Sequence, residues 1–588
     1  MSLDSASHQA TAPLHTATAT VQAIGTRWAV AAGHALASEA AARVLDAGGN
    51  AIDAGVAAGL TLGVVHPDMV SVAGVAPILV HVAKTGTTFQ ISGVGPYPRA
   101  STLAVFRARH GGQIPPGLAR TVVPAAPAAW LAALARWGTM SFADVAAPAT
   151  EHASRGFPVS RFSAYQMAAN AEKYRRWPTS AALFLREGRA YRTGEVLVQS
   201  ELGETLARMA EAERRAGGGR EAGIRAARDE VYRGETARRI VEFHRAEGGP
   251  LVADDLAAFE VEVGPALRTR FGAYEVAACG FWCQGPVLLQ MLNLLDGVDL
   301  GALGHNSPAY LHRLVETVKL AFADREAWYG DPAVVDVPAE GLLSKAYADA
   351  RRALFRPDRA APDMPPAGDP RRLGAVLVRE AALPLAGGAG PATDALDTSY
   401  VAVVDAEGNG FSATPSDPNV DAPVVAGVGS VVSPRGSQGW LDPAHPSVVA
   451  PGKRPRLTPA PAMALRDGRL FMPFGTPGGD VQQQAMLQVF LNIAVFGMPP
   501  QLAVEAPRAA SRSFPDSFWP HPAFPGQLNL EARISPDTAE ALAGLGHRIE
   551  RWAELDWRAG AVCAIVVGPD GTLMAGADPR RGAHAIGW

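Results

Sequence analysis

Apolar residues recur at helical and strand spacing along most of the chain, and they predict alternating helices and strands. A helix over residues 35–47 ends at Gly48-Gly49, where glycine favours helix termination. Asn50 is placed to cap a second helix over residues 51–65, with Asp53 in its first turn. The same spacing predicts strands at 76–82, 87–92, 399–404, 470–474 and 561–567, and helices at 310–328 and 482–496.

Two stretches lack either spacing. Residues 1–25 are rich in Ser, Thr and Ala, and we expect them to form a disordered tail. Residues 351–397 are rich in Pro, Arg, Ala and Gly, a composition that favours neither a helix nor a strand, so we expect a linker. This linker ends directly before the predicted strand at 399–404.

Thr398 stands at the boundary between the linker and that strand. Cleavage between Asp397 and Thr398 would make Thr398 a new N-terminus, whose α-amine has an unperturbed pKa of about 8. Such an amine can act as the base for the hydroxyl of the same residue, which is the N-terminal-threonine form of a nucleophile–base pair. Because threonine is also a common strand residue, the local pattern alone leaves an ordinary structural Thr398 as the alternative.

The composition allows a large core and excludes some classes of function. With 588 residues and 48% hydrophobic residues, the chain can form one large domain or two to four smaller ones. A net charge of −4 gives no basic field for nucleic acid and no polybasic patch for a membrane. No apolar window approaches the roughly 18 residues of a membrane span. The N-terminal residues show no secretion signal, so we expect a cytoplasmic location.

The spacing of cysteine and histidine predicts neither a disulfide framework nor a metal site. Cys279, Cys283 and Cys563 match no zinc or redox spacing. The fourteen histidines include no HExxH motif and no paired ligand spacing. We therefore expect no metal and no cofactor.

A glycine-rich loop, Gly475-Thr-Pro-Gly-Gly-Asp480, lies between a predicted strand and a predicted helix. Its glycines let backbone N–H groups turn toward a bound oxygen, and the following helix N-terminus adds partial positive charge. Val481-Gln482 follows where a phosphate-binding Walker loop requires Lys-Ser/Thr. A tight structural turn is the alternative to an oxygen-binding loop.

The segment Asp397-Thr-Ser-Tyr-Val-Ala-Val-Val-Asp405-Ala-Glu-Gly-Asn409 is followed by Ser412-Ala-Thr414-Pro-Ser416. Together they resemble the processing motif of the γ-glutamyltranspeptidase family: Thr-Ser/Thr-His, a strand, Asp-x-x-Gly-Asn and Thr-x-Thr. The likeness extends in patches from about residue 30 to 588, with further matches at 48–54, 321–332, 475–479 and 576–580. It implies an α/β fold, the Ntn-hydrolase four-layer αββα sandwich formed from one self-cleaving precursor.

The resemblance also implies roles for individual residues. Thr398 is implied as the nucleophile, with the cleavage site between Asp397 and Thr398. Cleavage there would give a large (α) subunit at 26–397 and a small (β) subunit at 398–588, the large subunit ending in the linker. Ser416 is implied to lie against the nucleophile, and Gly478 and Gly479 to form an oxyanion hole. The implied substrate-binding residues are Thr414, Arg435, Thr458 and Asp480.

Some family features are replaced in this sequence. Val94 falls where transpeptidases carry the arginine that holds the glutamyl α-carboxylate. Leu457-Thr458 replaces their Ser-Ser pair, and Tyr400 replaces their histidine. Arg435 is either a replacement cation at the site or an ordinary surface arginine. Because losing a bidentate carboxylate clamp lowers affinity, these replacements favour a substrate other than a γ-glutamyl compound.

We therefore expect an autoprocessing amidohydrolase or acylase that cleaves a small amide through an acyl-enzyme on Thr398. One alternative is a true γ-glutamyltransferase or glutathione hydrolase. Another is an unprocessed, non-catalytic relative that acts as a binding protein. The expected partners are a small-molecule amide and the two fragments of one precursor, with no nucleic acid and no membrane; a homodimer is left open.

Overall fold

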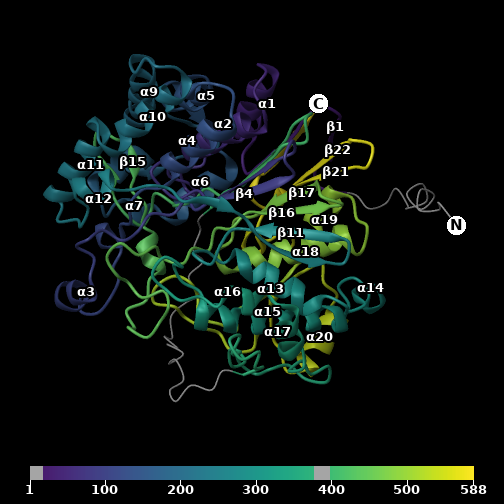
Figure 1. The fold of residues 1–588 in the computed structure, drawn as a ribbon. Helices are drawn as coiled ribbons and strands as arrows, with labels where there is room; N and C mark the ends of the chain where they lie inside the picture. The colour runs from purple at the N-terminus through teal and green to yellow at the C-terminus, as the bar shows by residue number, and fades with distance from the viewer. Residues whose placement is uncertain (1–17, 377–397) are drawn as a thin grey trace.

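Two seven-stranded sheets stack face to face, and helices cover the outer face of each (Figure 1). The computed structural model describes residues 18–376 and 398–588. In order across the first sheet, the strands are β23 (His584–Gly587), β2 (Ala29–Ala32), β12 (Val401–Val404), β13 (Gly410–Ala413), β3 (Ile78–Val82), β4 (Thr87–Ile91) and β9 (Val263–Pro265). In order across the second, they are β1 (Ala23–Gly25), β22 (Leu573–Ala577), β21 (Cys563–Val567), β17 (Arg469–Gly475), β16 (Ala462–Arg466), β11 (Tyr274–Ala278) and β10 (Leu267–Phe271).

Strand alternation explains how the sheets stack. Successive side chains of a strand point to opposite faces. In β12, Val401 and Val403 join the core beneath the helices, whereas Ala402 and Val404 join the core between the two sheets. A strand buried on both faces needs a continuous apolar run, which is what residues 401–404 supply.

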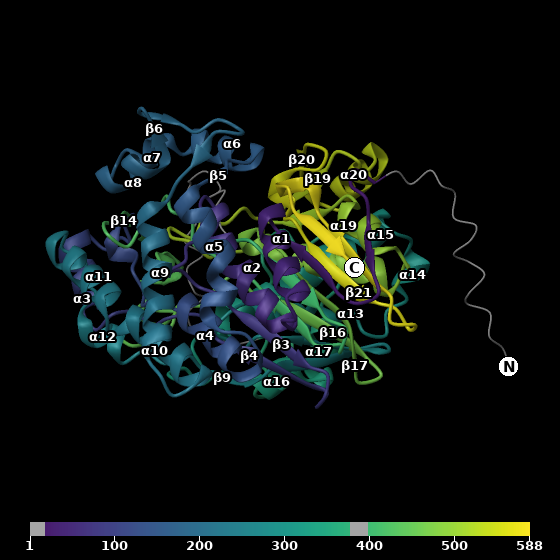
Figure 2. The ribbon, with the colours of Figure 1, turned by 90° about the horizontal axis from the view of Figure 1, so that it is seen from above.

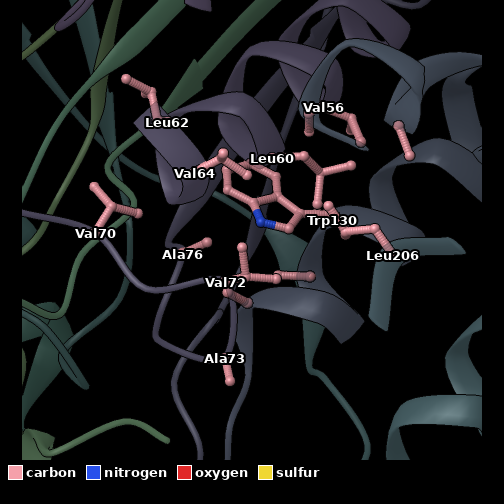
Figure 3. Close-up of a cluster of buried hydrophobic side chains, with 14 of the residues drawn as sticks. Val56, Leu60, Leu62, Val64, Val70, Val72, Ala73, Ala76, Trp130 and Leu206 are labelled. Carbon is pink, nitrogen blue, oxygen red and sulfur yellow. The ribbon is translucent and has the colours of Figure 1, made fainter. Parts of the chain in front are cut away.

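Glycines in α2 let this helix pack closely on the sheet and on α4. In α2, a Cβ added at Gly55 would lie 2.2 Å from the Phe411 ring, and one added at Gly59 would lie 2.5 Å from Trp130. Figure 3 shows Trp130 among the aliphatic side chains of this core. The main helices of this layer are α1 (Ala35–Asp46), α2 (Ala51–Val65), α4 (Ala126–Trp137), α5 (Phe142–Arg155), α9 (Ser200–Arg215) and α10 (Arg220–Tyr232).

The opposite helix layer packs on the second sheet around another apolar core. Its main helices are α13 (Gly285–Leu295), α15 (Pro308–Trp328), α17 (Lys345–Arg352), α18 (Gln482–Ala494) and α19 (Pro500–Glu505). A smaller lobe, built from α6 (Arg161–Ala169), α7 (Ala171–Tyr174) and α8 (Pro178–Phe184), stands beside the first layer (Figure 2). The four layers are helix, sheet, sheet and helix, as the resemblance implied.

Most predicted elements are present with shifted ends. The helix predicted at 310–328 is α15, and the one at 482–496 is α18, which ends two residues earlier. Asn50 caps α2 in a capping box with Asp53, as its position predicted. All three cysteines are free and buried.

The tail and the linker differ from expectation where the structure describes them. Residues 23–25 were expected to be part of a disordered tail, but they form β1, because β22 offers them a pairing edge. The predicted linker began at residue 351, yet α17 continues to Arg352 and buries Arg351. Residues 353–376 contain turns and an isolated bridge between Asp369 and Gly374, and the remainder of the predicted linker, 377–397 with Asp397, lies outside the described residues. The division into tail, large part and small part stays a prediction.

Each sheet combines strands from both sides of Thr398. The first sheet takes β2, β3, β4 and β9 from before this residue, and β12, β13 and β23 from after it. The second takes β1, β10 and β11 from before, and β16, β17, β21 and β22 from after. A cut at this position would therefore leave two chains that share both sheets. Among the described residues, none of the helices combines the length and apolar character needed to cross a membrane.

Candidate active site

Thr398 lies three residues before β12 in the protein interior, fully shielded from solvent. Its backbone N–H donates to the carbonyl of Met69 at 2.9 Å, and its Oγ1 lies 2.8 Å from Oγ of Ser416. The φ angle of Thr398 is 87°, a left-handed value that costs a β-branched residue of order 1–3 kcal/mol. The predicted nucleophile thus contacts its predicted partner and sits on strained backbone.

Arg435 is a buried cation at the centre of this site, with 1% of its surface exposed. Its guanidinium donates to Ser416 Oγ, and at 3.4 Å to Thr458 Oγ1. The alternative of an ordinary surface arginine is therefore wrong. Because a charged donor binds Ser416 Oγ, the Ser416 hydroxyl hydrogen can point to Thr398 Oγ1, where it would stabilise negative charge.

Asp417 is a site residue that the sequence did not reveal as the partner of Arg435. Its carboxylate forms a fully buried ion pair with the Arg435 guanidinium. The φ angle of Asp417 is 100°, and aspartate is one of the few non-glycine residues that visit this region. The partners are 18 residues apart in the chain, so no local pattern joins them. Among the described residues, Asp417 thus offsets the charge of Arg435.

Thr458 extends the cluster toward a neutral amide. Gln438 Nε2 donates to Thr458 Oγ1 at 3.0 Å, and Thr458 N–H donates back to Gln438 Oε1 at 3.4 Å.

Val94 is fully buried in the core between the two sheets. The position where the resemblance places the family's carboxylate-binding arginine is thus part of an apolar core.

Thr414 stays apart from this hydrogen-bonded cluster. Its backbone N–H donates to Pro77 O at 3.1 Å, while its buried Oγ1 has no hydrogen-bond partner among the described residues. The predicted role of Thr414 in substrate binding stays a prediction.

The glycine-rich loop connects β17 to α18. Two of its residues have backbone conformations that only glycine adopts easily. The φ angles are 132° at Gly478 and 56° at Gly479. Gln284 Nε2 donates to the Gly479 carbonyl at 3.0 Å, which fixes the loop from the opposite side. The backbone conformation therefore suits an oxyanion hole, a role that stays a prediction.

Asp480 holds this loop in place. It accepts hydrogen bonds from the backbone N–H and the hydroxyl of Ser517, both at 2.7 Å. It also pairs with the buried Arg325, whose Nη1 donates to Gln284 Oε1 at 3.1 Å. The Asp480 carboxylate is thus used for positioning, and its predicted contact with substrate stays a prediction.

A small cavity of about 30 Å³ opens beside the two loop glycines. Phe518 and Arg581 are among its lining residues. The centre of the Phe518 ring lies 5.5 Å from the Arg435 guanidinium carbon, so the cavity adjoins the cation at the nucleophile. Its size fits about one water molecule or one oxygen-bearing group.

A buried cluster lies behind the residue that follows the nucleophile. His66 Nδ1 is 3.3 Å from Ser399 Oγ, and His66 Nε2 is 3.9 Å from the Asp68 carboxylate. Burial, together with the nearby charge of Arg581, lowers the pKa of His66 to about 3. Burial raises the pKa of Asp68 to about 6, against the smaller opposing effects of the Ser163 hydroxyl and of the Arg581 charge.

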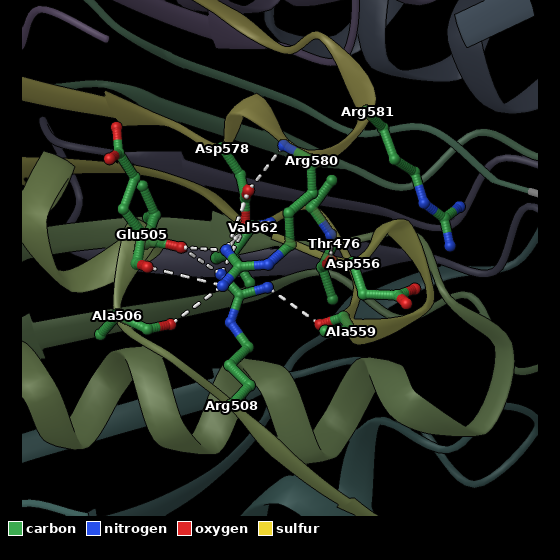
Figure 4. Close-up of polar contacts among 12 residues, drawn as sticks. Thr476, Glu505, Ala506, Arg508, Asp556, Ala559, Val562, Asp578, Arg580 and Arg581 are labelled. Atoms are coloured by element: carbon green, nitrogen blue, oxygen red, sulfur yellow. Dashed lines mark hydrogen bonds and ion pairs between the residues drawn. The ribbon is translucent and has the colours of Figure 1, made fainter. Parts of the chain in front are cut away.

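The closing motif of the chain, around Asp578, forms a buried network of charged side chains. The Asp578 carboxylate accepts from Arg580 Nη1 at 3.1 Å and from the backbone N–H of Val562 at 3.2 Å, and it pairs with Arg508 (Figure 4). Arg580 also pairs with Glu531 at 2.6 Å. Arg581, the next residue, points away from this network (Figure 4).

Within the described residues, one trio has its potential ligand atoms close enough to hold a metal ion: His312, Glu316 and His547, within 4.8 Å of one another. The Glu316 carboxylate already accepts from Lys319 Nζ at 2.8 Å. The two histidine rings meet edge to face, with nitrogens 2.9 Å apart. The Lys319 ammonium group already neutralises the Glu316 carboxylate and would repel a metal cation beside it. We therefore interpret this trio as a hydrogen-bonded network.

Two stacked sheets between helix layers, with a threonine hydroxyl at the start of a central strand, define the class of an N-terminal-nucleophile hydrolase. The γ-glutamyltranspeptidase family matches residues 37–588, and the chain belongs to this family.

Known relatives extend over nearly the whole chain. It is 32% identical to the glutathione hydrolase-like YwrD proenzyme of Bacillus subtilis, over 96% of this chain and 99% of that protein. It is 33% identical to the acylase ACY 1 proenzyme of a Pseudomonas species, over 94% of this chain and 92% of that protein. The crystal structure of cephalosporin acylase from Bacillus halodurans superimposes with a TM-score of 0.83 at 28% identity, covering 97% of this chain and 98% of that one.

Proposed function

We propose that the chain is an autoprocessing amidohydrolase or acylase with Thr398 as its nucleophile. The observation that carries the proposal is the 2.8 Å contact between Thr398 Oγ1 and Ser416 Oγ, with the Arg435 guanidinium behind Ser416. This arrangement stabilises an oxygen anion on Thr398. The relatives named above are proenzymes, which supports activation by cleavage.

In the processing step, Thr398 Oγ1 attacks the carbonyl carbon of Asp397 while the peptide nitrogen takes a proton. The product is an ester between Asp397 and Thr398, with a free α-amine on Thr398. Water then hydrolyses the ester, which leaves two fragments that are no longer joined covalently. The strain at Thr398 assists the first step, because breaking the peptide bond frees its φ angle.

In turnover, the α-amine takes the proton from Thr398 Oγ1 as the hydroxyl attacks the amide carbonyl of a substrate. The backbone N–H groups of Gly478 and Gly479 would stabilise the tetrahedral oxyanion. The amine of the substrate leaves with a proton, and water resolves the acyl ester. An amine acceptor in place of water would make the same enzyme an acyltransferase.

The site favours a substrate other than a γ-glutamyl compound. Val94 gives an apolar core position where a carboxylate clamp would be needed, and Asp417 neutralises Arg435. Because Arg435 already pairs with a carboxylate, it is a poorer clamp for the α-carboxylate of a γ-glutamyl substrate.

The proposal is tested by measuring the release of p-nitroaniline from small N-acyl-p-nitroanilides and from γ-glutamyl-p-nitroanilide. We expect turnover of simple acyl compounds by the wild type, none by Thr398→Ala, and a reduced rate by Thr398→Ser, with acyl mass on residue 398 after rapid quenching. A rate on γ-glutamyl-p-nitroanilide well above that on simple amides would instead support the transferase alternative. Activity that survives in Thr398→Ala would refute the assignment of the nucleophile.

The cytoplasmic location and the homodimer stay predictions. A protein that stays uncut, turns over no amide and binds small molecules unchanged would support the non-catalytic alternative.

A further inference from the structure

A large cavity of about 1000 Å³ lies between the lobe that carries α6 and the C-terminal part of the chain. Figure 2 shows this lobe standing opposite β19 (Gln527–Glu531), β20 (Arg548–Trp552) and α20 (Pro536–Gly544). Small-molecule sites commonly occupy about 300–1000 Å³, so this cavity can hold a substrate of considerable size. Its residues include His34, Phe162, Tyr165, Leu555, Trp557 and Arg581.

Arg581 joins this cavity to the glycine-rich loop. It lines both the large cavity and the small cavity beside Gly478, as does Trp557. A Cβ added at Gly478 would lie 3.9 Å from Arg581 Nη2. Arg581 Nη1 lies 3.9 Å from Met69 Sδ, and the Met69 carbonyl accepts from Thr398 N–H at 2.9 Å. Met69 thus lies between Thr398 and Arg581, a residue that lines the large cavity.

The aromatic side chains around Arg581 define the chemistry of the cavity. The guanidinium carbon lies 5.6 Å from the centre of the Trp557 ring and 6.0 Å from that of the Phe162 ring. Its Nε donates to Trp557 O at 3.0 Å, which orients the planar group. Tyr165 is 58% exposed, so a large aromatic surface faces solvent at this cavity. A guanidinium group and aromatic side chains can both stack on an aromatic ring of a ligand.

Charge at the cavity favours neutral or anionic groups. Arg580 also lines it, but this residue is paired with Glu531 and Asp578. The other charged lining residues are Arg161, Arg581 and one acid, Glu554. A cationic ligand would meet two arginines there.

We propose that this cavity binds the acyl part of the substrate, and that the substrates are amides of carboxylic acids that carry an aromatic ring. The ring packs against Phe162, Trp557 and the Arg581 guanidinium, while the amide carbonyl reaches Gly478 and Gly479. This inference rests on the proposed function, because it assigns the acyl group that Thr398 would receive.

The first test compares kcat/KM for phenylacetyl-p-nitroanilide with kcat/KM for acetyl-p-nitroanilide. We expect the wild type to prefer the phenylacetyl compound by about tenfold or more, as one buried ring justifies. Phe162→Ala should reduce this ratio by about tenfold, and Arg581→Gln should reduce it as well. Val334→Ala removes an exposed apolar side chain elsewhere and should leave the ratio unchanged. An unchanged ratio in Phe162→Ala would overturn the proposal.

The second test is titration calorimetry of 3-phenylpropionate and of acetate with the wild type and Phe162→Ala. We expect the wild type to bind 3-phenylpropionate at least tenfold more tightly than acetate, with this difference lost in the variant. Specific binding without any amide turnover would refute the proposed function and keep the cavity assignment. Amide turnover with neither an aryl preference nor specific binding would refute the cavity assignment and keep the proposed function. Neither binding nor turnover would refute both.

Discussion

At the scale of single residues, the site depends on a buried charge pair. Arg435 and Asp417 are both shielded from solvent, and of these two residues it is Arg435 that binds Ser416 Oγ. A buried ion pair is weak evidence for stability, but removing one partner leaves an uncompensated charge that costs about 3–5 kcal/mol. Variants of the two partners can therefore distinguish an effect of Arg435 on stability from its effect on the chemistry at Thr398.

We predict that Arg435→Met lowers the free energy of unfolding by about 3–5 kcal/mol, because Asp417 is left buried without its cation. The double variant Arg435→Met/Asp417→Asn should recover most of this stability in denaturant titration. It should not recover processing at residue 398, because Ser416 still lacks its charged donor. Recovery of both properties together would show that Arg435 acts only through stability.

Asp68 makes the stability of the protein depend on pH. Its pKa is raised by burial from 3.8 to about 6, so the unfolded chain loses this proton at a lower pH than the folded chain. The contribution of Asp68 to stability is therefore fully present below pH 3.8 and is lost as pH rises through about 6. The loss amounts to about 3 kcal/mol, since one pKa unit is about 1.4 kcal/mol.

We predict that Asp68→Asn is more stable than the wild type at pH 8 by up to about 3 kcal/mol, with the difference shrinking toward pH 4. Urea titrations of both proteins between pH 4 and 8 measure it. A difference that does not change with pH would show that Asp68 has an ordinary pKa in the folded protein.

At the scale of elements, the loop between β17 and α18 must keep one backbone conformation, because its N–H groups are proposed to bind the oxyanion. Gly479 has a φ of 56°, and a Cβ there would meet nothing closer than Phe518 at 3.9 Å. Alanine at this position would thus introduce backbone strain of about 1–2 kcal/mol without a clash.

We predict that Gly479→Ala lowers kcat by about 100-fold through a shift of the loop, with a smaller effect on KM. Gly497→Ala is a matched control, because Gly497 has a φ of 64°, open space around it and no place in the site. Its stability should fall by a similar amount with kcat unchanged. Equal effects of both variants on kcat would contradict a special role for the loop.

Sequence patterns predicted the elements that depend on local signals. The caps and glycines at 48–53, the apolar run of β12 and the helices α15 and α18 follow from neighbouring residues alone. The contact between Thr398 and Ser416 came from the motif. The Arg435–Asp417 pair, the support of Asp480 by Arg325 and the outward direction of Arg581 depend on tertiary packing, and no local spacing encodes them.

At the scale of the whole molecule, the position of residue 398 decides how a processed protein would behave. Both sheets and both outer cores contain residues from either side of this position. The two fragments would therefore share an interface of the size and apolar character of a protein core.

We predict that the fragments stay together after cleavage. They should elute as one species in size-exclusion chromatography in native buffer and separate only in denaturant. Fragments that part in native buffer would contradict the shared sheets, and a single intact chain in denaturant would mean that no cleavage occurred.

The intact mass of freshly purified protein, measured under denaturing conditions with Thr398→Ala alongside, tests the central claim most directly. We predict that the wild type gives two fragments, one ending at Asp397 and the other beginning at Thr398, and that the variant gives one chain of 588 residues. A single uncut chain in both proteins, or the same two fragments in both, would contradict Thr398 as the nucleophile of its own processing.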